Sequence, residues 1–310
     1  MPSHSEGIVI QASSGLFQVE TADGVIECMA RAGADPGAIA AGDHVLISPQ
    51  PAGRGVIESL MPRTTRFSRK VAGRRQDEQV IAANLDQVVI VVAAAEPPFR
   101  ETTLDRYLAA AEHCDLNAIV CINKVDLVPA PDPDSACDLA DRAEIYSRIG
   151  YMVIMTSAET GSGIALLRQT LEGRVSALVG PSGVGKSSLI CAVSPGVNLD
   201  TSEISSSTGK GRHTTTCSRL IKLDGGGYVA DTPGMREFGF HQISRDELAW
   251  CFREFRPHTK SCRFADCHHV KEPGCGVREA VEQGLVSPGR YEHYLRLMGG
   301  VNQSNRLVVC

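Results

Sequence analysis

A glycine-rich run in the second half of the chain has the spacing of a phosphate-binding loop. Residues 180–188 read GPSGVGKSS, which matches the pattern G-x4-G-K-[ST] with Gly180, Gly185, Lys186 and Ser187 at the fixed positions. Glycines let the backbone curl so that successive N–H groups point at phosphate oxygens. The lysine reaches the outer phosphates, and the serine hydroxyl is a ligand for Mg²⁺. A predicted strand precedes the run and a predicted helix follows it, so we interpret it as a nucleotide site.

Two earlier segments are typical of a guanine pocket. NKVD, at residues 123–126, follows a predicted strand. The carboxylate of Asp126 can accept hydrogen bonds from the N1–H and N2–H₂ edge of guanine, a donor pair that adenine lacks. Lys124 can lie over the base while Asn123 braces the loop. TSA, at residues 156–158, follows one strand–helix unit later, and its backbone can donate to guanine O6. Together these segments favour GTP over ATP.

The order of the segments along the chain is unusual. DTPG, at residues 231–234, ends a predicted strand, where Asp231 can hold the hydration shell of Mg²⁺ and the Gly234 N–H can contact the γ-phosphate. In most GTPases the phosphate loop comes first and the guanine segments last, whereas here the guanine segments come first. This order predicts a circularly permuted GTPase domain, whose site survives because the original termini lie close together at the surface. The residues predicted to bind GTP are Asn123, Lys124, Val125, Asp126, Ser157, Ala158, Gly180, Pro181, Ser182, Gly183, Val184, Gly185, Lys186, Ser187, Ser188, Asp231 and Gly234.

Soft metal ligands are concentrated near the C-terminus, in the sequence CRFADCHHVKEPGC. The spacing C-x4-C-x-H-x5-C suits a tetrahedral Cys₃His zinc site, and four protein ligands leave no open position, so the single zinc ion would be structural. His268 is an alternative ligand. The alternative is a region without a metal, in which three thiols are buried beside exposed histidines. The predicted zinc ligands are Cys262, Cys267, His269 and Cys275.

Composition places the chain among ordinary folded proteins. It has 310 residues, of which 43% are hydrophobic and 22% charged, which excludes general disorder, collagen and a coiled coil. The longest apolar run, residues 88–95, is eight residues long and too short to span a membrane, and no secretory signal opens the sequence. Eleven cysteines, an odd number, favour a reducing compartment over a disulfide framework. We therefore expect a cytoplasmic protein with no membrane partner.

The net charge of −5 gives no general tendency to bind nucleic acid, but two segments are locally basic. Each is either a contact surface for an RNA backbone or a solvated face. The basic residues of the first are Arg63, Arg66, Arg69, Lys70, Arg74 and Arg75, and those of the second are Arg253, Arg256, His258, Lys260 and Arg263.

The elements that must position these motifs fall into a multidomain α/β chain. Short strands separated by turn residues predict an OB-like β-barrel over residues 1–62. A basic linker, 63–84, follows it. Alternating apolar strands and helices over 85–240 predict a doubly wound domain, the permuted P-loop GTPase. Residues 241–310 are predicted to form a zinc-binding, helical domain.

The motifs NKVDL, GPSGVGKSSL, GKGRHTTT, DTPGMREFG and CRFADCHHVKEPGC resemble the ribosome small-subunit-dependent GTPase A family of bacteria, and the resemblance covers roughly residues 7–298. It implies a late assembly factor of the small ribosomal subunit with rRNA-binding flanking domains, whose weak GTPase is stimulated by that subunit. Within the metal cluster the resemblance points to His269. We expect a monomer that acts on the small subunit and its rRNA.

Hydrolysis must use a group other than the usual glutamine. Met235 occupies the position after D-x-x-G where Ras-like enzymes place the glutamine that orients water. His213, in GRHTTT, could approach the γ-phosphate, and in the family that the chain resembles this histidine is the proposed catalytic group. The alternative is a loop histidine that contacts a partner. One of the threonines 214–216 should reach Mg²⁺, and we favour the middle one. The predicted catalytic residues are Lys186, His213 and Thr215, and the predicted magnesium ligands are Ser187, Thr215 and Asp231.

Three other functions share some of these features. A permuted GTPase that acts on the large subunit would carry the same nucleotide segments. An RNA-binding zinc protein could bind GTP without turnover, which Met235 allows. A P-loop kinase would need ATP selectivity, and NKVD argues against it.

Overall fold

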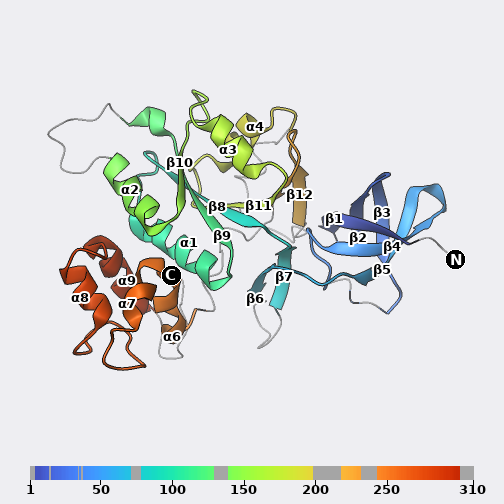
Figure 1. Cartoon of the computed structure of the whole chain (residues 1–310). Helices are drawn as coiled ribbons and strands as arrows, with labels where there is room; N and C mark the ends of the chain where they lie inside the picture. The colour runs from blue at the N-terminus through green and yellow to red at the C-terminus, as the bar shows by residue number, and fades with distance from the viewer. Residues whose placement is uncertain are drawn as a thin grey trace, which may run out of the picture.

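The computed structural model places three bodies side by side (Figure 1). The N-terminal barrel lies at one end, an α/β domain in the middle, and a C-terminal group of helices against the α/β domain. No helix in the described ranges is both long and apolar enough to cross a lipid bilayer. The structure describes residues 4–13, 15–33, 35, 38–70, 78–128, 139–197, 218–231 and 243–300.

The N-terminal strands close into a barrel with the connectivity of an OB-fold. Strands β1 (Ser5–Ser13), β2 (Leu16–Thr21) and β3 (Gly24–Ala30) form a meander, and β3 runs parallel to β5 (Arg54–Leu60). Strand β4 (His44–Gln50) pairs with both β5 and β1 and so closes the barrel. Alternate side chains point inward: in β2, Phe17 and Val19 are buried, whereas Leu16 and Gln18 are exposed. The predicted OB-like barrel is confirmed.

The middle domain is built on parallel strands in the order β10-β9-β8-β11-β13. The central strand β8 is buried along its whole length, as its continuous apolar sequence predicts. The strands are β8 (Gln87–Ala93), β9 (Asn117–Asn123), β10 (Met152–Met155), β11 (Val175–Val179) and β13 (Tyr228–Asp231).

Alternate residues of β8 face two layers of helices. Val88 and Ile90 pack with α1 (Glu101–His113) and α2 (Leu139–Ile149). Val89 and Val91 pack on the other face with α3 (Ile164–Leu171) and α4 (Lys186–Val193). Helices on both faces confirm the predicted doubly wound α/β fold. The carboxyl ends of the parallel strands therefore meet at one edge, where ligand sites of such folds form.

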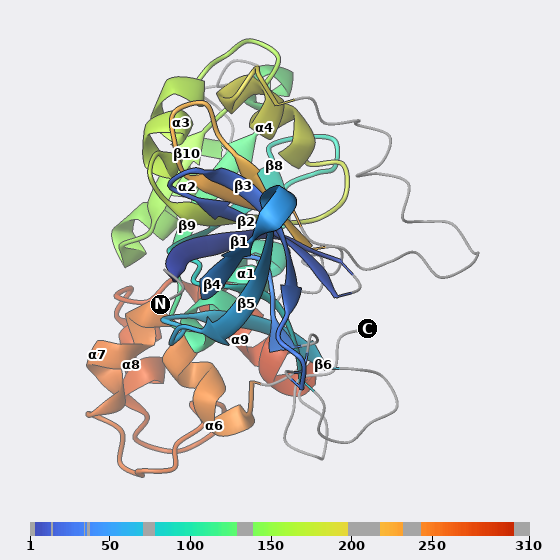
Figure 2. The ribbon, with the colours of Figure 1, turned by 90° about the vertical axis from the view of Figure 1, so that its right-hand side faces the viewer.

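The sheet of the α/β domain continues into the barrel. Strand β12 (Ser218–Lys222) pairs antiparallel with β13 on one side and with β1 on the other, through the pairs Gln11–Arg219 and Ala12–Ser218. In the part of the chain that the structure describes, eleven strands form this one sheet. Viewed from the barrel side, the barrel lies in front of the α/β domain (Figure 2). No feature of the sequence had predicted this junction.

A separate two-stranded hairpin and short 3-10 helices accompany the large sheet. Strands β6 (Arg66–Lys70) and β7 (Glu78–Ala83) pair as an antiparallel hairpin between the barrel and β8. The 3-10 helices in the described ranges are η2 (Pro51–Gly53), η3 (Val125–Leu127), η5 (Ala249–Cys251) and η6 (Arg253–Phe255).

A carboxylate joins the barrel to the α/β domain, and its effect on stability should depend on pH. Glu20 of β2 accepts hydrogen bonds from Lys222 of β12 and from Tyr228 of β13, the latter at 2.6 Å. These bonds lower the pKa of Glu20 below its ordinary value of about 4.3. Because the folded-state pKa is the lower one, the contribution to stability is present above about pH 4.3 and is lost as the pH falls through the folded value.

We therefore expect the difference in unfolding free energy between the wild type and Glu20→Gln to be largest near neutral pH and to shrink below about pH 4. Urea unfolding at a series of pH values measures it. A difference that stays constant over that range would show that the carboxylate charge contributes nothing at this junction.

The C-terminal helices pack around their own aromatic core. Phe252, Phe255 and Tyr294 lie with ring centroids 5.0 to 5.3 Å apart, and this core packs against Ala109 of α1. Ser244 begins the first helix with a reciprocal capping box to Glu247, which satisfies the free N–H groups there. The helices are α6 (Arg245–Leu248), α7 (Arg256–Thr259), α8 (Gly276–Glu282) and α9 (Pro288–Gly300).

A buried charge network fixes α9 to α1. The Arg290 guanidinium donates to Asp105 of α1 at 2.6 Å and to Glu254 at 2.7 Å, and its side chain is 3% exposed. Asp105 also bonds Tyr146 and His293. Burial works against the charge on the guanidinium, but the two carboxylates outweigh it and raise the pKa of Arg290.

Replacing Arg290 by alanine is expected to lower the unfolding free energy by about 3–5 kcal/mol, because both carboxylates stay buried without their partner. The matched control is Arg296→Ala on the same helix. Arg296 pairs with Glu292 at the surface, where both side chains are more than 60% exposed, so its loss should cost at most about 1 kcal/mol. Urea unfolding of both variants tests this, and equal effects would be inconsistent with a buried network that stabilises the interface.

Candidate nucleotide and metal sites

The glycine-rich run lies between β11 and α4, at the carboxyl edge of the sheet. Gly180 has a φ of +141°, and a Cβ there would lie 2.0 Å from a backbone carbonyl oxygen of β8. A Cβ at Gly185, where φ is +93°, would lie 2.4 Å from Nδ2 of Asn123. Only glycine fits either place. Lys186 begins α4, and its Nζ donates to the carbonyl oxygens of Gly180 at 2.8 Å and Pro181 at 2.7 Å, which holds the ammonium group against the loop.

Asn123 ties three of the predicted segments together. It ends β9 and is 1% exposed. Its Nδ2 donates to the carbonyl oxygen of Val184 in the glycine-rich run at 2.9 Å, and its Oδ1 accepts from Oγ1 of Thr156 at 3.1 Å. The backbone N–H of Val125 in turn donates to the Thr156 carbonyl at 3.2 Å. NKVD, TSA and the glycine-rich run are therefore held at fixed separations by one buried amide.

The side chains beyond Asn123 differ in exposure. Lys124 adopts a left-handed backbone conformation with φ +62°, and its ammonium group bonds the carbonyl of Glu96 in the loop after β8. Asp126 lies in η3 with an exposed side chain. Ser157 is fully buried: its N–H donates to the Ser162 carbonyl at 2.9 Å. The carboxylate of Asp126 is thus open to solvent, next to a rigid turn.

A cavity of about 310 Å³ borders the glycine-rich run. Pro181, Ser182 and Val184 form one wall, and the end of β8, the segment after it and the first turn of α1 form the other. The residues of this second wall are not among the site residues predicted from the sequence. Their one signal was their place after the carboxyl end of a central buried strand. The residues of the second wall, apart from Val92 and Ala93 at the end of β8, are Pro97, Pro98, Phe99, Arg100 and Thr103.

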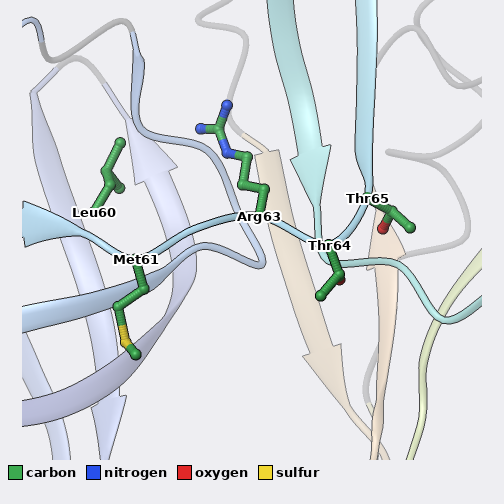
Figure 3. A pocket seen from close by; sticks show the side chains of 5 residues that line it. All are labelled: Leu60, Met61, Arg63, Thr64 and Thr65. Carbon is green, nitrogen blue, oxygen red and sulfur yellow. The ribbon is translucent and has the colours of Figure 1, made fainter.

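A second cavity, of about 460 Å³, lies where the chain leaves the barrel (Figure 3). Its described lining is Leu60, Met61, Arg63, Thr64 and Thr65, none of which belongs to a nucleotide motif. Arg63 points to the opposite side of the chain from Met61 (Figure 3), and both Nε and NH2 donate to the buried Asp43, at 2.6 and 2.7 Å. The guanidinium therefore stabilises the barrel through the buried carboxylate of Asp43, and its charge is already compensated.

Some of the predicted site residues cannot be placed. His213, Thr214, Thr215, Thr216, Gly234 and Met235 lie outside the described residues. Asp231 is the last residue of β13, the strand beside β11, and the structure describes its backbone only.

The soft ligands near the C-terminus meet in one cluster. The ligand atoms of Cys262, Cys267, His269 and Cys275 all lie within 4.8 Å of one another. Nδ1 of His269 is 3.5 Å from Sγ of Cys262 and 3.4 Å from Sγ of Cys275. A tetrahedral zinc ion would set such N–S separations at about 3.6 Å, so the residues fit the ion. His268, in contrast, is 39% exposed in its side chain and lies 3.8 Å from Asp246, away from the cluster.

Several side chains shape the peptide that carries the ligands. Tyr291 and Tyr294 of α9 donate to the carbonyl oxygens of His269 and His268, at 2.7 and 2.6 Å. The carboxylate of Glu272 accepts from backbone N–H groups of His268, Val270 and Lys271, the shortest at 2.8 Å. Partial burial opposes ionisation of this carboxyl group, but the N–H donors prevail and lower the pKa of Glu272 to about 2.

Known proteins that are similar to this chain carry one family name. A family model described as RsgA GTPase matches residues 60–241. A small ribosomal subunit biogenesis GTPase RsgA from Gemmatimonas aurantiaca is 46% identical over 305 residues, which cover 96% of this chain and 97% of that protein. The chain belongs to the RsgA GTPase family. The predicted family membership is therefore confirmed.

Two solved structures of similar proteins extend over nearly the whole chain. YjeQ from Thermotoga maritima has a TM-score of 0.78 at 36% identity, and the match covers 96% of this chain and 98% of that one. YloQ, described as a circularly permuted GTPase, has a TM-score of 0.75 at 31% identity, covering 96% and 94%. The predicted fold, a barrel followed by a permuted GTPase domain and a metal-cluster region, agrees with these RsgA-like structures.

The basic segment of this RsgA-family chain near the metal cluster is partly neutralised within the molecule. Nε of Arg253 and NH2 of Arg256 each donate to the carboxylate of Glu112 at the end of α1, both at 2.6 Å. The Arg253 guanidinium also lies over the Tyr151 ring, 4.2 Å from its centroid. These two arginines therefore hold the helical region against the GTPase domain. The exposed cations of this segment are Lys260 and Arg263.

Proposed function

We propose that the chain hydrolyses GTP to GDP and phosphate as a late assembly factor of the small ribosomal subunit. The observation that carries the proposal is the buried bridge through Asn123, because it joins the guanine-recognition segments to the glycine-rich run at one edge of the sheet. Relatives that align with nearly the whole chain are small ribosomal subunit biogenesis GTPases, which supports the partner.

Guanine would be selected by the segments on either side of this bridge. The exposed carboxylate of Asp126 would accept from guanine N1–H and N2–H₂, and Lys124 would lie over the base. The N–H of Ala158 would donate to O6, beside the buried Ser157, whose own N–H is bonded to Ser162. The residues of the 180–188 loop would hold the phosphates through their backbone N–H groups, at the start of α4.

Hydrolysis would depend on charge compensation and on a positioned water. Lys186, now bonded to loop carbonyls, would turn its ammonium group to the outer phosphates. Mg²⁺ bound with GTP supplies positive charge to the phosphate oxygens, and hydroxyl and carboxylate oxygens suit it as ligands, so Ser187, Thr215 and Asp231 would hold it. His213 would orient the attacking water in place of the glutamine that Ras-like enzymes use.

The flanking regions would bind ribosomal RNA. In this proposal the chain divides into a barrel (1–62), a basic linker (63–84), the GTPase domain (85–240) and a helical domain (241–310). One zinc ion would hold the last of these together through its four ligands, without a catalytic role. The protein would work as a monomer in the cytoplasm, without a membrane partner.

GTP hydrolysis by the purified protein, alone and with isolated small or large ribosomal subunits, tests the proposal, with ATP as the control nucleotide. Strong stimulation by the small subunit alone is expected, and His213→Ala should remove it while GTP binding persists. Stimulation by the large subunit instead would assign the other partner. GTP binding without turnover in any mixture would make the chain an RNA-binding zinc protein with an inactive nucleotide site.

A further inference from the structure

The metal cluster carries an aromatic side chain on its outside. Phe264 lies between the ligands Cys262 and Cys267, and 40% of its surface is exposed. It is absent from the buried core that Phe252, Phe255 and their neighbours form. A ring held outside the core can stack on another planar group through its exposed part.

The backbone that carries this ring is fixed on both sides. The N–H of Arg263 donates to the carbonyl of Gly274 at 2.8 Å. A Cβ at Gly274, where φ is +68°, would lie 3.2 Å from Cβ of Arg263, so the two segments pass close together. Metal ligation at Cys262 and Cys267 would hold both ends of the short loop. A ring presented this rigidly loses little conformational entropy when a partner binds.

Uncompensated positive charge lies beside the ring at Arg263, and a second exposed cation, Lys260, stands four residues before the ring in the sequence. The guanidinium of Arg263 is 5.6 Å from the centroid of Phe264, and both Arg263 and Lys260 are exposed. Within the described ranges neither cation forms an ion pair, whereas Arg253 and Arg256 of the same segment are bound to Glu112. An exposed ring with two free cations fits a polyanion whose planar groups can stack.

Trp250 provides a contrast on the same domain. It is 61% exposed and has a guanidinium, that of Arg256, 4.9 Å from its centroid. That guanidinium also donates to Glu112 at 2.6 Å and to the Trp250 carbonyl at 2.9 Å. The cation beside Trp250 is therefore already neutralised. Trp250 has exposure and no free charge, so it serves as the matched control.

We propose that Phe264, with Arg263 and Lys260, binds an unpaired nucleotide of ribosomal RNA: the base stacks on the phenyl ring and the two cations contact the adjacent phosphates. Stacking of single-stranded bases on aromatic rings beside basic side chains is a general mode of RNA recognition. The inference rests on the proposed function, because it specifies how the helical domain would contact the small subunit.

The first test is the affinity of the full-length, zinc-loaded protein for purified small ribosomal subunits at fixed salt. Phe264→Ala and Phe264→Leu are expected to bind about tenfold more weakly, because leucine keeps apolar volume but cannot stack. Phe264→Trp should keep the affinity, and Trp250→Ala should stay within about twofold. Zinc content equal to that of the wild type shows that each variant keeps its cluster. Arg263→Gln should lower the slope of log K against log[salt] by about 1.

The second test monitors the side chain at position 264 by its fluorescence. Trp250 is the only tryptophan of the chain, so a Trp250→Phe, Phe264→Trp double variant carries a single fluorophore at position 264. Stacking on a base should quench its emission when small subunits are added. A blue shift without quenching would place the ring on a protein surface and overturn the inference.

These measurements distinguish failure of the stacking site from failure of the assembly function. If the wild type binds small subunits and Phe264→Ala binds them equally well, the stacking site is refuted and the assembly function stands. If the wild type does not bind small subunits at all, the assembly function and the inference are both refuted.

Discussion

Replacing Asp126 by asparagine should convert the nucleotide preference of this GTPase from GTP to XTP. Xanthine carries a carbonyl oxygen where guanine carries the N2 amine, so an asparagine NH₂ group can donate to it, whereas the aspartate carboxylate repels it. With GTP, the same NH₂ group would face the amine of guanine and leave both unpaired. Sites that depend on such hydrogen bonds reject the mismatched ligand strongly, and we expect GTP affinity to fall at least about a hundredfold.

The exposed position of Asp126 should confine the effect of this substitution to recognition of the base. The side chain of Asp126 is exposed, and among the described residues no hydrogen bond or ion pair of its carboxylate is found, so Asp126→Asn should leave the melting temperature unchanged. Asn123→Ala is the contrasting variant, because it removes the buried bridge to Val184 and Thr156 and should lower stability as well as affinity. Titration with GTP and XTP measures the preference. If the two nucleotides bind Asp126→Asn with the wild-type ratio of affinities, the base is recognised elsewhere.

Loss of the zinc ion proposed for the Cys₃His cluster is expected to have the largest effect on stability. Metal binding contributes about 10–16 kcal/mol of apparent free energy to the folding of small zinc modules. The short segment that carries the cluster residues around Cys275 is expected to need this contribution in order to stay folded. Cys275→Ser removes one ligand and also the sulfur that caps α8 by accepting from the Arg278 N–H at 3.5 Å. We expect loss of zinc, loss of near-UV signal from the C-terminal aromatic core, and retention of GTP binding by the separate core around β8.

A second cysteine of the same region supplies the control. Cys251 is 2% exposed and lies outside the cluster, where its Sγ donates to the Glu247 carbonyl at 3.3 Å. Cys251→Ala should keep one zinc per chain and lose only about 1 kcal/mol of stability. Zinc content by atomic absorption and thermal unfolding distinguish the variants. A Cys275→Ser protein that still holds one zinc at wild-type stability would exclude the assigned ligand set.

The parts of the structure with local signals could be predicted. The barrel follows from alternating strands such as β2, and the α/β domain from the continuous apolar run of β8. The cysteine cluster follows from ligand spacing over fourteen residues, since such a short loop brings its ligands together whatever the rest of the fold.

Contacts between distant segments had no such signal. Glu20 meets Lys222, and Asp105 meets Arg290, across separations of 202 and 185 residues. In the sequence Arg253 and Arg256 look the same as Lys260 and Arg263, and only the position of Glu112 distinguishes the neutralised pair from the free one. The cavity wall that follows β8 was missed for a related reason. Loop residues acquire a role from what they face, and Phe99 and Arg100 line a cavity with the glycine-rich run only in the folded chain.

The pairing of β1 with β12 bears on synthesis of the chain by the ribosome. Gln11 and Ala12 gain their partners on β12 only after residue 219 has been made, roughly 200 residues later. At 5–20 residues per second, this part of β1 waits about 10–40 s as an open strand edge. Open edges recruit other strands, so nascent chains of this protein are exposed to misassembly in that interval. The junction that unites two domains in the finished molecule therefore leaves one strand edge of the first domain unpaired until most of the second has been made.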